Sequence, residues 1–399
     1  MLPRSRPDLR IAGLVLAALL SGGCRAPSPV APPTASAGAR FDATGFRAEG
    51  LKEVHRLLEG YRGRGAFPGG VLAAGRSGNP VHLHPFGRLS YAVDAPPATA
   101  GTLYDLASLT KVVATTTMAM ILVDEGRLDL DLPVQRFLPG FQGPGKEAVT
   151  VRHLLTHSSG LGSGAPLYRE IRGRAAYLRR IQALDLVYPP GSRSVYSDFG
   201  MILLGEVLSR VAGEPLDVFV RHRVFEPLAM RDTMYLPPAE LLPRIAPTED
   251  DPWRGLVVRG EVHDENTAAM GGVAPHAGLF GTAGDLARFA RMLMNGGVLE
   301  EHRIVSRETV ELFTRRAGIP GSDRALGWDT KSAEGSSAGT LFSPRSFGHT
   351  GFTGTSLWID PEREVFVILL TNRVHPTRQN NLIREARPEV ADAVVRALY

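Results

Sequence analysis

The stretch Tyr104-Asp-Leu-Ala-Ser-Leu-Thr-Lys111 places Ser108 three residues before Lys111, and no other lysine of the chain has a serine at that spacing. Residues three apart on a helix share a face, with Cβ atoms about 5–6 Å apart, so the amine can reach the serine hydroxyl. An amine that takes the hydroxyl proton turns a weak alcohol into a nucleophile. The pair therefore predicts a nucleophilic serine, although one short motif also arises by chance.

Two further motifs follow in order, Tyr196-Ser197-Asp198 and His349-Thr350-Gly351. Together with the serine and lysine they resemble the serine β-lactamases and penicillin-binding proteins, whose signatures are Ser-x-x-Lys, Ser/Tyr-x-Asn and Lys-Thr-Gly. The tyrosine form of the second motif is similar to class C β-lactamases and to their esterase and D-Ala-D-Ala carboxypeptidase relatives. The resemblance runs from about Phe41 to the C-terminus, and the strings 153–161 and 354–360 are similar to the family too.

Strand patterns lie near both ends of the chain. Residues 69–74 and 80–87 read as one hairpin, and residues 356–360 and 365–371 read as a second. An amphipathic helix is predicted over 45–61, and another helix after Asn380. These patterns predict one antiparallel sheet built from both termini, with flanking helices and an inserted all-helical region. The resemblance implies that this is the α+β fold of the β-lactamase/transpeptidase-like type.

We divide the chain accordingly into a signal peptide (1–23), a flexible lipoprotein-type linker (24–42) and a serine hydrolase domain (43–399), with a helical region at about 107–296 inserted between sheet segments 43–106 and 297–399. Within that region, residues 111–124 read as one buried helix stopped by Gly126. Thr150 is predicted to cap a helix that runs to Ser158, and Thr282 to open a capping box.

The composition is that of a soluble globular protein, with 399 residues, 43% of them hydrophobic and 22% charged. The net charge of +4 comes from 41 arginines and only 4 lysines set against 41 acidic residues. Because the arginines are scattered rather than clustered, a nucleic-acid partner is not indicated.

The N-terminus reads as an export signal. Three arginines in the first ten residues precede the apolar run 11–20, which is too short to span a bilayer as a helix. Small residues before Cys24, the only cysteine, resemble the lipobox of bacterial lipoproteins, although Ser21 stands where that pattern has leucine. We expect an exported protein held at the bacterial membrane, in the periplasm or cell envelope, by a lipid anchor on Cys24; ordinary cleavage near residues 35–37 stays open as the alternative.

The resemblance implies a mechanism that needs no metal and no cofactor. In it, Ser108 attacks the substrate carbonyl, Lys111 takes its proton, and the Tyr196 phenol serves as partner base and then protonates the leaving group. A nearby ammonium is expected to lower the pKa of that phenol. The backbone N–H groups of Ser108 and Phe352 would form the oxyanion hole.

Two substitutions within the motifs affect the expected substrate. Asp198 stands where the family has asparagine, and an ionised carboxylate cannot donate to a substrate carbonyl. It could instead pair with Lys111, which would keep that lysine cationic and leave Tyr196 as the base. His349 replaces a lysine that offers a fixed charge to a substrate carboxylate, and an imidazole titrates near pH 6.5. Both changes weaken the prediction of an efficient β-lactamase.

Four more residues are candidates for substrate binding. Thr350 could hydrogen-bond a substrate carboxylate, and Gly351 leaves room for the backbone to approach the substrate. His263 and Glu265 lie in a loop expected at the mouth of the site, where structural and substrate-contact roles are equally open.

Other classes of function are weighed against this prediction. His153 and His157 are four apart, as in a helical zinc site, but Leu154 stands where the glutamate of His-Glu-x-x-His is required. A non-catalytic penicillin- or peptide-binding sensor is the second alternative, and the intact nucleophile set argues against it. The acyl substrate stays open among D-Ala-D-Ala peptides, esters, D-amino-acid amides and β-lactams.

Overall fold

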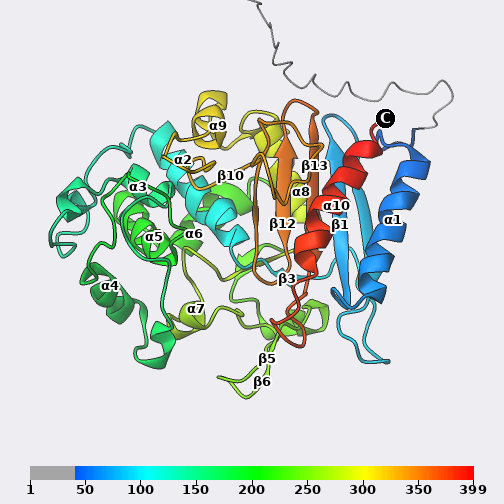
Figure 1. Cartoon of the computed structure of the whole chain (residues 1–399), viewed down its shortest axis with the longest axis horizontal. Helices are drawn as coiled ribbons and strands as arrows, with labels where there is room; N and C mark the ends of the chain where they lie inside the picture. The colour runs from blue at the N-terminus through cyan, green and yellow to red at the C-terminus, as the bar shows by residue number, and fades with distance from the viewer. Residues whose placement is uncertain (1–40) are drawn as a thin grey trace, which may run out of the picture. The chain divides into compact units, whose positions relative to one another are not determined.

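The computed structural model describes residues 41–399 (Figure 1). The predicted signal peptide and almost all of the predicted linker, including Cys24, lie outside these residues. Among residues 41–399, no helix combines the length and the apolar character that crossing a bilayer requires.

A six-stranded antiparallel sheet joins the two ends of the described chain. Its order is β10 (Asp329–Thr330), β11 (Phe347–Thr350), β12 (Ser356–Asp360), β13 (Val365–Thr371), β1 (Gly69–Arg76) and β2 (His82–Gly87). Both predicted hairpins form, and β1 pairs with β13 so that Val71 lies opposite Leu370. The predicted α+β class, with a sheet built from both termini, is confirmed.

Side chains of β1 and β13 alternate between two apolar layers, because successive residues of a strand point to opposite faces. Leu72 and Leu369 face the layer of α1 (Ala48–Gly63) and α10 (Ile383–Arg396), which lie side by side on one face of the sheet in Figure 1. Val71 and Ile368 belong to the larger core that holds α8 (Ala283–Met294), on the other face. Burial on both faces explains why these strands are apolar throughout.

The segment between β2 and β10 is mainly helical. Its longest helix is α5 (Asp198–Ala212), which packs against α2 (Thr117–Asp124), α3 (Val151–Leu155) and α4 (Arg174–Gln182). The boundaries drawn for this region stay a prediction, and α8 lies inside the range 107–296 although it covers the sheet. The remaining helices are η2 (Val134–Arg136), η3 (Lys146–Ala148), η4 (Leu167–Arg169), α6 (Leu216–Val220), η5 (Arg221–Phe225), η6 (Ala239–Arg244), α7 (Glu265–Ala269) and α9 (Arg307–Thr314).

Three small sheets complete the described fold. The one that matters for the site consists of β3 (Tyr104–Asp105), β7 (Leu279–Gly281) and β4 (Met234–Tyr235), and β3 leads directly into the segment that carries Ser108. The others are the pairs β5 (Asp250–Asp251) with β6 (Leu256–Val257) and β8 (Val298–Leu299) with β9 (His302–Arg303).

The predicted helix caps form, although Asp285 accepts hydrogen bonds from Asp232 and Thr233 and does not complete the capping box predicted at Thr282. Two helices differ from expectation. Thr150 caps α3 and Thr282 caps α8 through their side chains, as expected. However, α3 ends at Leu155 rather than Ser158, because His157 takes a left-handed backbone conformation with φ 53°. The helix predicted over 111–124 begins with the wider π-helical turns of η1 (Lys111–Thr116) and becomes α-helical only at Thr117.

Candidate active site

The turn before the nucleophile is held in a conformation that side-chain-bearing residues rarely adopt. Ala107 has φ 46°, and its N–H donates to Asp105 Oδ1 at 2.8 Å. Leu106 N donates to Leu279 O at 2.9 Å, which ties the turn to β7. Strained backbone of this kind persists only where its surroundings fix it, and it is concentrated at functional sites.

Lys111 is buried and directed at Ser108. Its Nζ lies 3.1 Å from Ser108 Oγ, 3.0 Å from the carbonyl oxygen of His276 and 2.7 Å from Asp198 Oδ1. Burial works to lower the pKa of Lys111, but the negative charge of Asp198 and the neighbouring Tyr196 outweigh it, so the pKa is raised. The lysine is therefore a cation at neutral pH and donates to the serine oxygen. This charge state favours the alternative that the sequence left open, in which Asp198 keeps Lys111 cationic and Tyr196 takes the proton.

Tyr196 lies beside the same lysine, with Lys111 Nζ 4.7 Å from the centre of its ring. Burial raises the pKa of the phenol, and the charge of Lys111 together with hydrogen bonds to Lys111 and Ser108 lowers it; the net pKa is raised. The Lys111 ammonium lowers the pKa of Tyr196, as expected, but burial raises this pKa by more. The resting site thus holds a phenol and an ammonium.

Asp198 begins α5 and forms the ion pair with Lys111 that the sequence suggested. Ser197 caps this helix by accepting from Gly200 N at 3.0 Å. About a third of the Asp198 side chain is exposed, whereas Lys111 is 1% exposed. The carboxylate therefore supplies a negative charge at the solvent side of a buried ammonium.

His349 and Thr350 lie on β11. His349 is buried and does not present a positive charge to the site. Its side chain is 2% exposed, its Nδ1 is 2.8 Å from Thr350 O, and its ring centre is 5.9 Å from that of Tyr196. Burial lowers the pKa of His349 to about 4. The expectation of titration near pH 6.5 is therefore wrong, because that value belongs to a solvated imidazole. With Nδ1–H donating to a carbonyl, the neutral ring keeps an acceptor at Nε2.

Gly351 is required for a reason that the sequence did not indicate. A Cβ at this position would lie 2.0 Å from Thr355 Oγ1 and 2.5 Å from the carbonyl oxygen of Leu106. The close approach is thus between the end of β11 and the segment that carries Ser108, rather than between the backbone and a substrate. Phe352 follows with 48% of its surface exposed.

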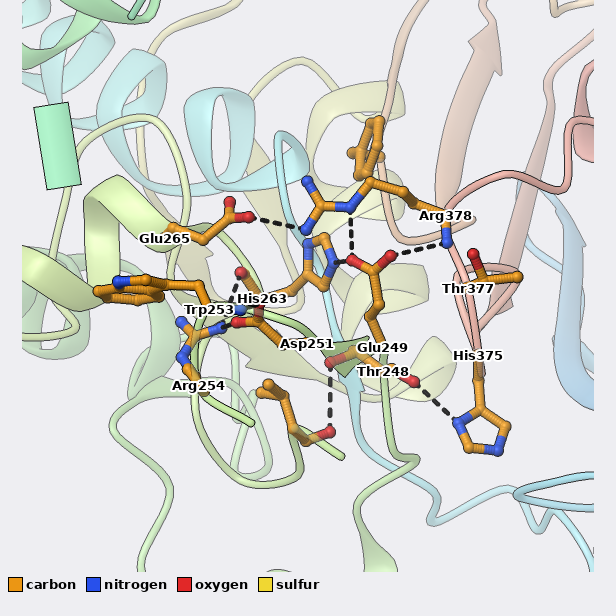
Figure 2. A network of polar contacts seen from close by, with 12 residues as sticks. Thr248, Glu249, Asp251, Trp253, Arg254, His263, Glu265, His375, Thr377 and Arg378 are labelled. Atoms are coloured by element: carbon orange, nitrogen blue, oxygen red, sulfur yellow. Dashed lines mark hydrogen bonds and ion pairs between the residues drawn. The ribbon is translucent and has the colours of Figure 1, made fainter. Parts of the chain in front are cut away.

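His263 and Glu265 belong to a polar network with Glu249 and Arg378 (Figure 2). His263 Nε2 is 2.9 Å from Glu249 Oε2, Glu249 also accepts from Arg378, and Arg378 Nη2 donates to Glu265 Oε1 at 2.7 Å. The ring of His263 stacks on Phe352 with centres 5.7 Å apart. Both candidates are therefore engaged with protein groups, and neither lines the hollow that contains Ser108.

That hollow has a volume of about 370 Å³, and Thr350 and Gly351 line it together with Ser108 and Tyr196. Its wall also carries arginines that the sequence analysis missed: Arg324, Arg373, Arg378, Arg384 and Arg387. Arg324 pairs with Asp329, and Arg378 with Glu249 and Glu265. In the part of the chain that the structure describes, no ion pair forms to the other three. No local motif distinguishes these three residues within the 41 arginines of the chain. They reach the site only through the fold, because β13, the turn after it and α10 bring them there.

A zinc site at His153 and His157 does not form. His153 folds back on Thr150, with Nδ1 3.1 Å from Thr150 N, and His157 lies beyond the end of α3. Across residues 41–399 no group of three or more His, Cys, Asp or Glu side chains is arranged to hold a metal ion.

Ser108, Lys111 and Tyr196 all lie in the part of the chain that matches a known protein family. The model of the family described as Beta-lactamase matches residues 54–392, which is most of the chain. The chain belongs to the β-lactamase family. This β-lactamase-family protein is therefore a serine hydrolase.

Relatives and solved structures of the family are similar over most of their length. A protein of Escherichia coli (strain K12) named "Putative D-alanyl-D-alanine carboxypeptidase" is 33% identical over 330 residues, 74% of this chain and 75% of that one. An "N-acetylmuramyl-L-alanine amidase" of Bacillus subtilis (strain 168) is 31% identical over 367 residues, 83% and 82% of the two chains. A penicillin-binding protein homologue from Caulobacter crescentus shares the fold, with TM-score 0.70, 24% identity and coverage of 90% and 100%.

Proposed function

We propose that this β-lactamase-family protein hydrolyses its substrate through an acyl-enzyme formed on Ser108. The observation that carries the proposal is the convergence of Ser108 Oγ, the Lys111 ammonium 3.1 Å away and the Tyr196 phenol beside that ammonium. A nucleophile, a base held next to it and an orienting charge are the parts that serine acyl transfer requires.

The charge states favour Tyr196 as the base. When the Lys111–Tyr196 pair has lost one proton, the phenolate takes the Ser108 proton while the ammonium stabilises it. Ser108 Oγ then bonds to the substrate carbonyl carbon, and the N–H groups of Ser108 and Phe352 stabilise the oxyanion. Tyr196 returns the proton to the leaving group as the tetrahedral intermediate collapses. Water hydrolyses the acyl-enzyme by the same steps in reverse order.

The charge of the hollow supports a substrate with a carboxylate. Arg373, Arg384 and Arg387 line it beside Ser108, and among residues 41–399 no carboxylate pairs with any of them. Within the described part of the chain, Asp329 is the one carboxylate that lines this hollow, and it pairs with Arg324, so the charge of the lining is positive on balance. A cleft with an excess of one sign of charge attracts ligands of the opposite sign. We therefore propose D-alanyl peptides of the cell wall as the first substrate class and esters as the second. The names of the carboxypeptidase and amidase relatives support cell-wall peptides.

A class C-like β-lactamase is the second candidate, since β-lactams also carry a carboxylate. Asp198 and the neutral His349 oppose it, because neither provides the donor or the fixed charge of the family signature. A panel of four substrates separates these possibilities: an N-acylated D-Ala-D-Ala peptide, an N-acetylmuramyl-L-alanine peptide, p-nitrophenyl acetate and nitrocefin. We expect turnover of a cell-wall peptide, lost in Ser108→Ala. Turnover of nitrocefin alone would favour the second candidate, and labelling without turnover would refute a hydrolytic role.

We also propose that the protein is exported and held at the bacterial membrane through a lipid on Cys24. The charged N-terminal residues, the short apolar run 11–20 and the single cysteine after small residues support this. Several acyl chains together anchor a protein stably, whereas one chain anchors it only marginally.

A further inference from the structure

His157 holds the main chain on both sides of Tyr196. Its carbonyl oxygen accepts from Val195 N at 2.8 Å, and its Nδ1 accepts from Ser197 N at 3.1 Å. The imidazole also lies against the phenol ring, with ring centres 4.7 Å apart. One residue therefore contacts the residue before Tyr196, the residue after it and Tyr196 itself.

The left-handed conformation of His157 makes this double contact possible. With φ 53° at the residue, the chain leaves α3 and turns back, so the carbonyl and the side chain both face the segment 195–197. Histidine, asparagine and aspartate are enriched among residues that adopt this conformation without being glycine. Tyr188 Oη donates to the same carbonyl at 3.2 Å and fixes it further.

His157 acts as a neutral acceptor rather than as a proton carrier. The side chain is buried, and its Nδ1 must be unprotonated to accept from Ser197 N, so the proton lies on Nε2. Burial and the nearby charges of Arg324 and Lys111 hold the pKa of His157 well below its usual value. It does not line the hollow that contains Ser108, so it does not touch the substrate.

We infer that His157 is a positioning residue for Tyr196: it fixes the segment 195–197 so that the phenol lies beside Lys111 and Ser108. The inference rests on the proposed role of Tyr196 in acyl transfer. A displacement of about 1 Å in a catalytic group can cost about 10²-fold in rate. Loss of the acceptor should therefore slow the chemical step and leave substrate binding unchanged, because His157 does not line the hollow.

The test compares three substitutions of His157 on p-nitrophenyl acetate. Asparagine tolerates the left-handed conformation and places Oδ1 where histidine has Nδ1, glutamine places its acceptor one bond farther out, and leucine has no acceptor. We expect kcat to fall about 10²-fold in His157→Leu with KM within about 3-fold, and His157→Asn to recover most of the loss. His157→Gln should be slower than His157→Asn by about 10-fold.

His153→Leu is the matched control, because it removes the other histidine of the same segment, which completes the capping box of Thr150 and does not contact Tyr196. It should lower the melting temperature but leave kcat within about 2-fold. A His157→Leu variant that folds and keeps wild-type kcat would overturn the inference. If that variant does not fold, equal kcat in His157→Asn and His157→Gln would overturn it instead.

Tyr196→Phe separates this inference from the proposed function. Full activity in Tyr196→Phe would refute the role of the phenol, and with it the reason for positioning it. A slow Tyr196→Phe together with a normal His157→Leu would refute the positioning role alone.

Discussion

Replacing Asp198 by asparagine should make the enzyme active at lower pH. Asp198 Oδ1 lies 2.7 Å from Lys111 Nζ, and its negative charge raises the pKa of both Lys111 and Tyr196. The competent state has lost one proton from this pair, so the carboxylate opposes its formation. An amide still accepts from the ammonium but carries no charge, and the first proton should therefore leave at lower pH.

The magnitude follows from the geometry. At 2.7 Å and an effective dielectric constant of about 20, Coulomb's law gives about 6 kcal/mol. Asp198 is 34% exposed, so solvent screening reduces the usable part to about 1–3 kcal/mol. At about 1.4 kcal/mol for each tenfold change in the proton equilibrium, the acid limb of the kcat/KM profile should move down by about 1–2 pH units. The apparent pKa of this acid limb is a property of the coupled Lys111–Tyr196 pair and not of either group alone.

The assay is kcat/KM for p-nitrophenyl acetate between pH 5.5 and 9.5, because a neutral ester reports the free enzyme without charge on the substrate. Asp131→Asn is the control, since it removes a carboxylate that pairs with Arg152 away from the site. An acid limb that stays within about 0.3 pH units of wild type, or moves up, would refute the assignment of the base to the coupled pair.

Three further outcomes are expected. Ser108→Ala should abolish turnover of every substrate in the panel and labelling by a fluorophosphonate, with the melting temperature within a few degrees of wild type; residual wild-type turnover would exclude the covalent mechanism. Burial holds the pKa of His349 at about 4, so its imidazole stays neutral at pH 6–8. The ratio of kcat/KM for an N-acylated D-Ala-D-Ala peptide to kcat/KM for p-nitrophenyl acetate should therefore be constant across this range. A rise of this ratio as the pH falls through 6.5 would show that His349 is solvated. Cys24→Ser should move the protein from the membrane fraction to the soluble fraction of its host, and an unchanged distribution would contradict the lipid anchor.

Local sequence patterns determined those features of this protein that depend on interactions between residues close together in the chain. The two hairpins follow from apolar runs bounded by turn residues, and β1 pairs with β13 in the antiparallel sheet that the runs predicted. Thr150 and Thr282 cap the helices that follow them, because a cap needs only a side chain two or three residues from the N–H it satisfies. The spacing of Ser108 and Lys111 likewise fixes their contact, since both lie on consecutive turns of one segment.

Burial and long-range neighbours decided the chemistry of the site. His349 and Tyr196 were both predicted from the sequence as site residues, with an ordinary pKa for His349 and a lowered pKa for Tyr196. Both pKa expectations differ from the structure. The pKa depends on how deeply a side chain is buried and on distant charges, and neighbouring residues in the chain determine neither. The end of α3 was misplaced for a related reason, since His157 leaves the helix to bind the segment 195–197.

The arginines of the hollow could be found only from the tertiary structure. Arg373, Arg384 and Arg387 are more than 260 residues from Ser108 in the sequence. Nothing in their local sequence distinguishes them from the other arginines of the chain, which has 41 in total. The antiparallel sheet brings β13 and α10 back beside the N-terminal strands and so places their charges next to the nucleophile. Helix and strand periodicity act over a few residues, whereas the potential in a cleft is the sum over groups that only folding brings together.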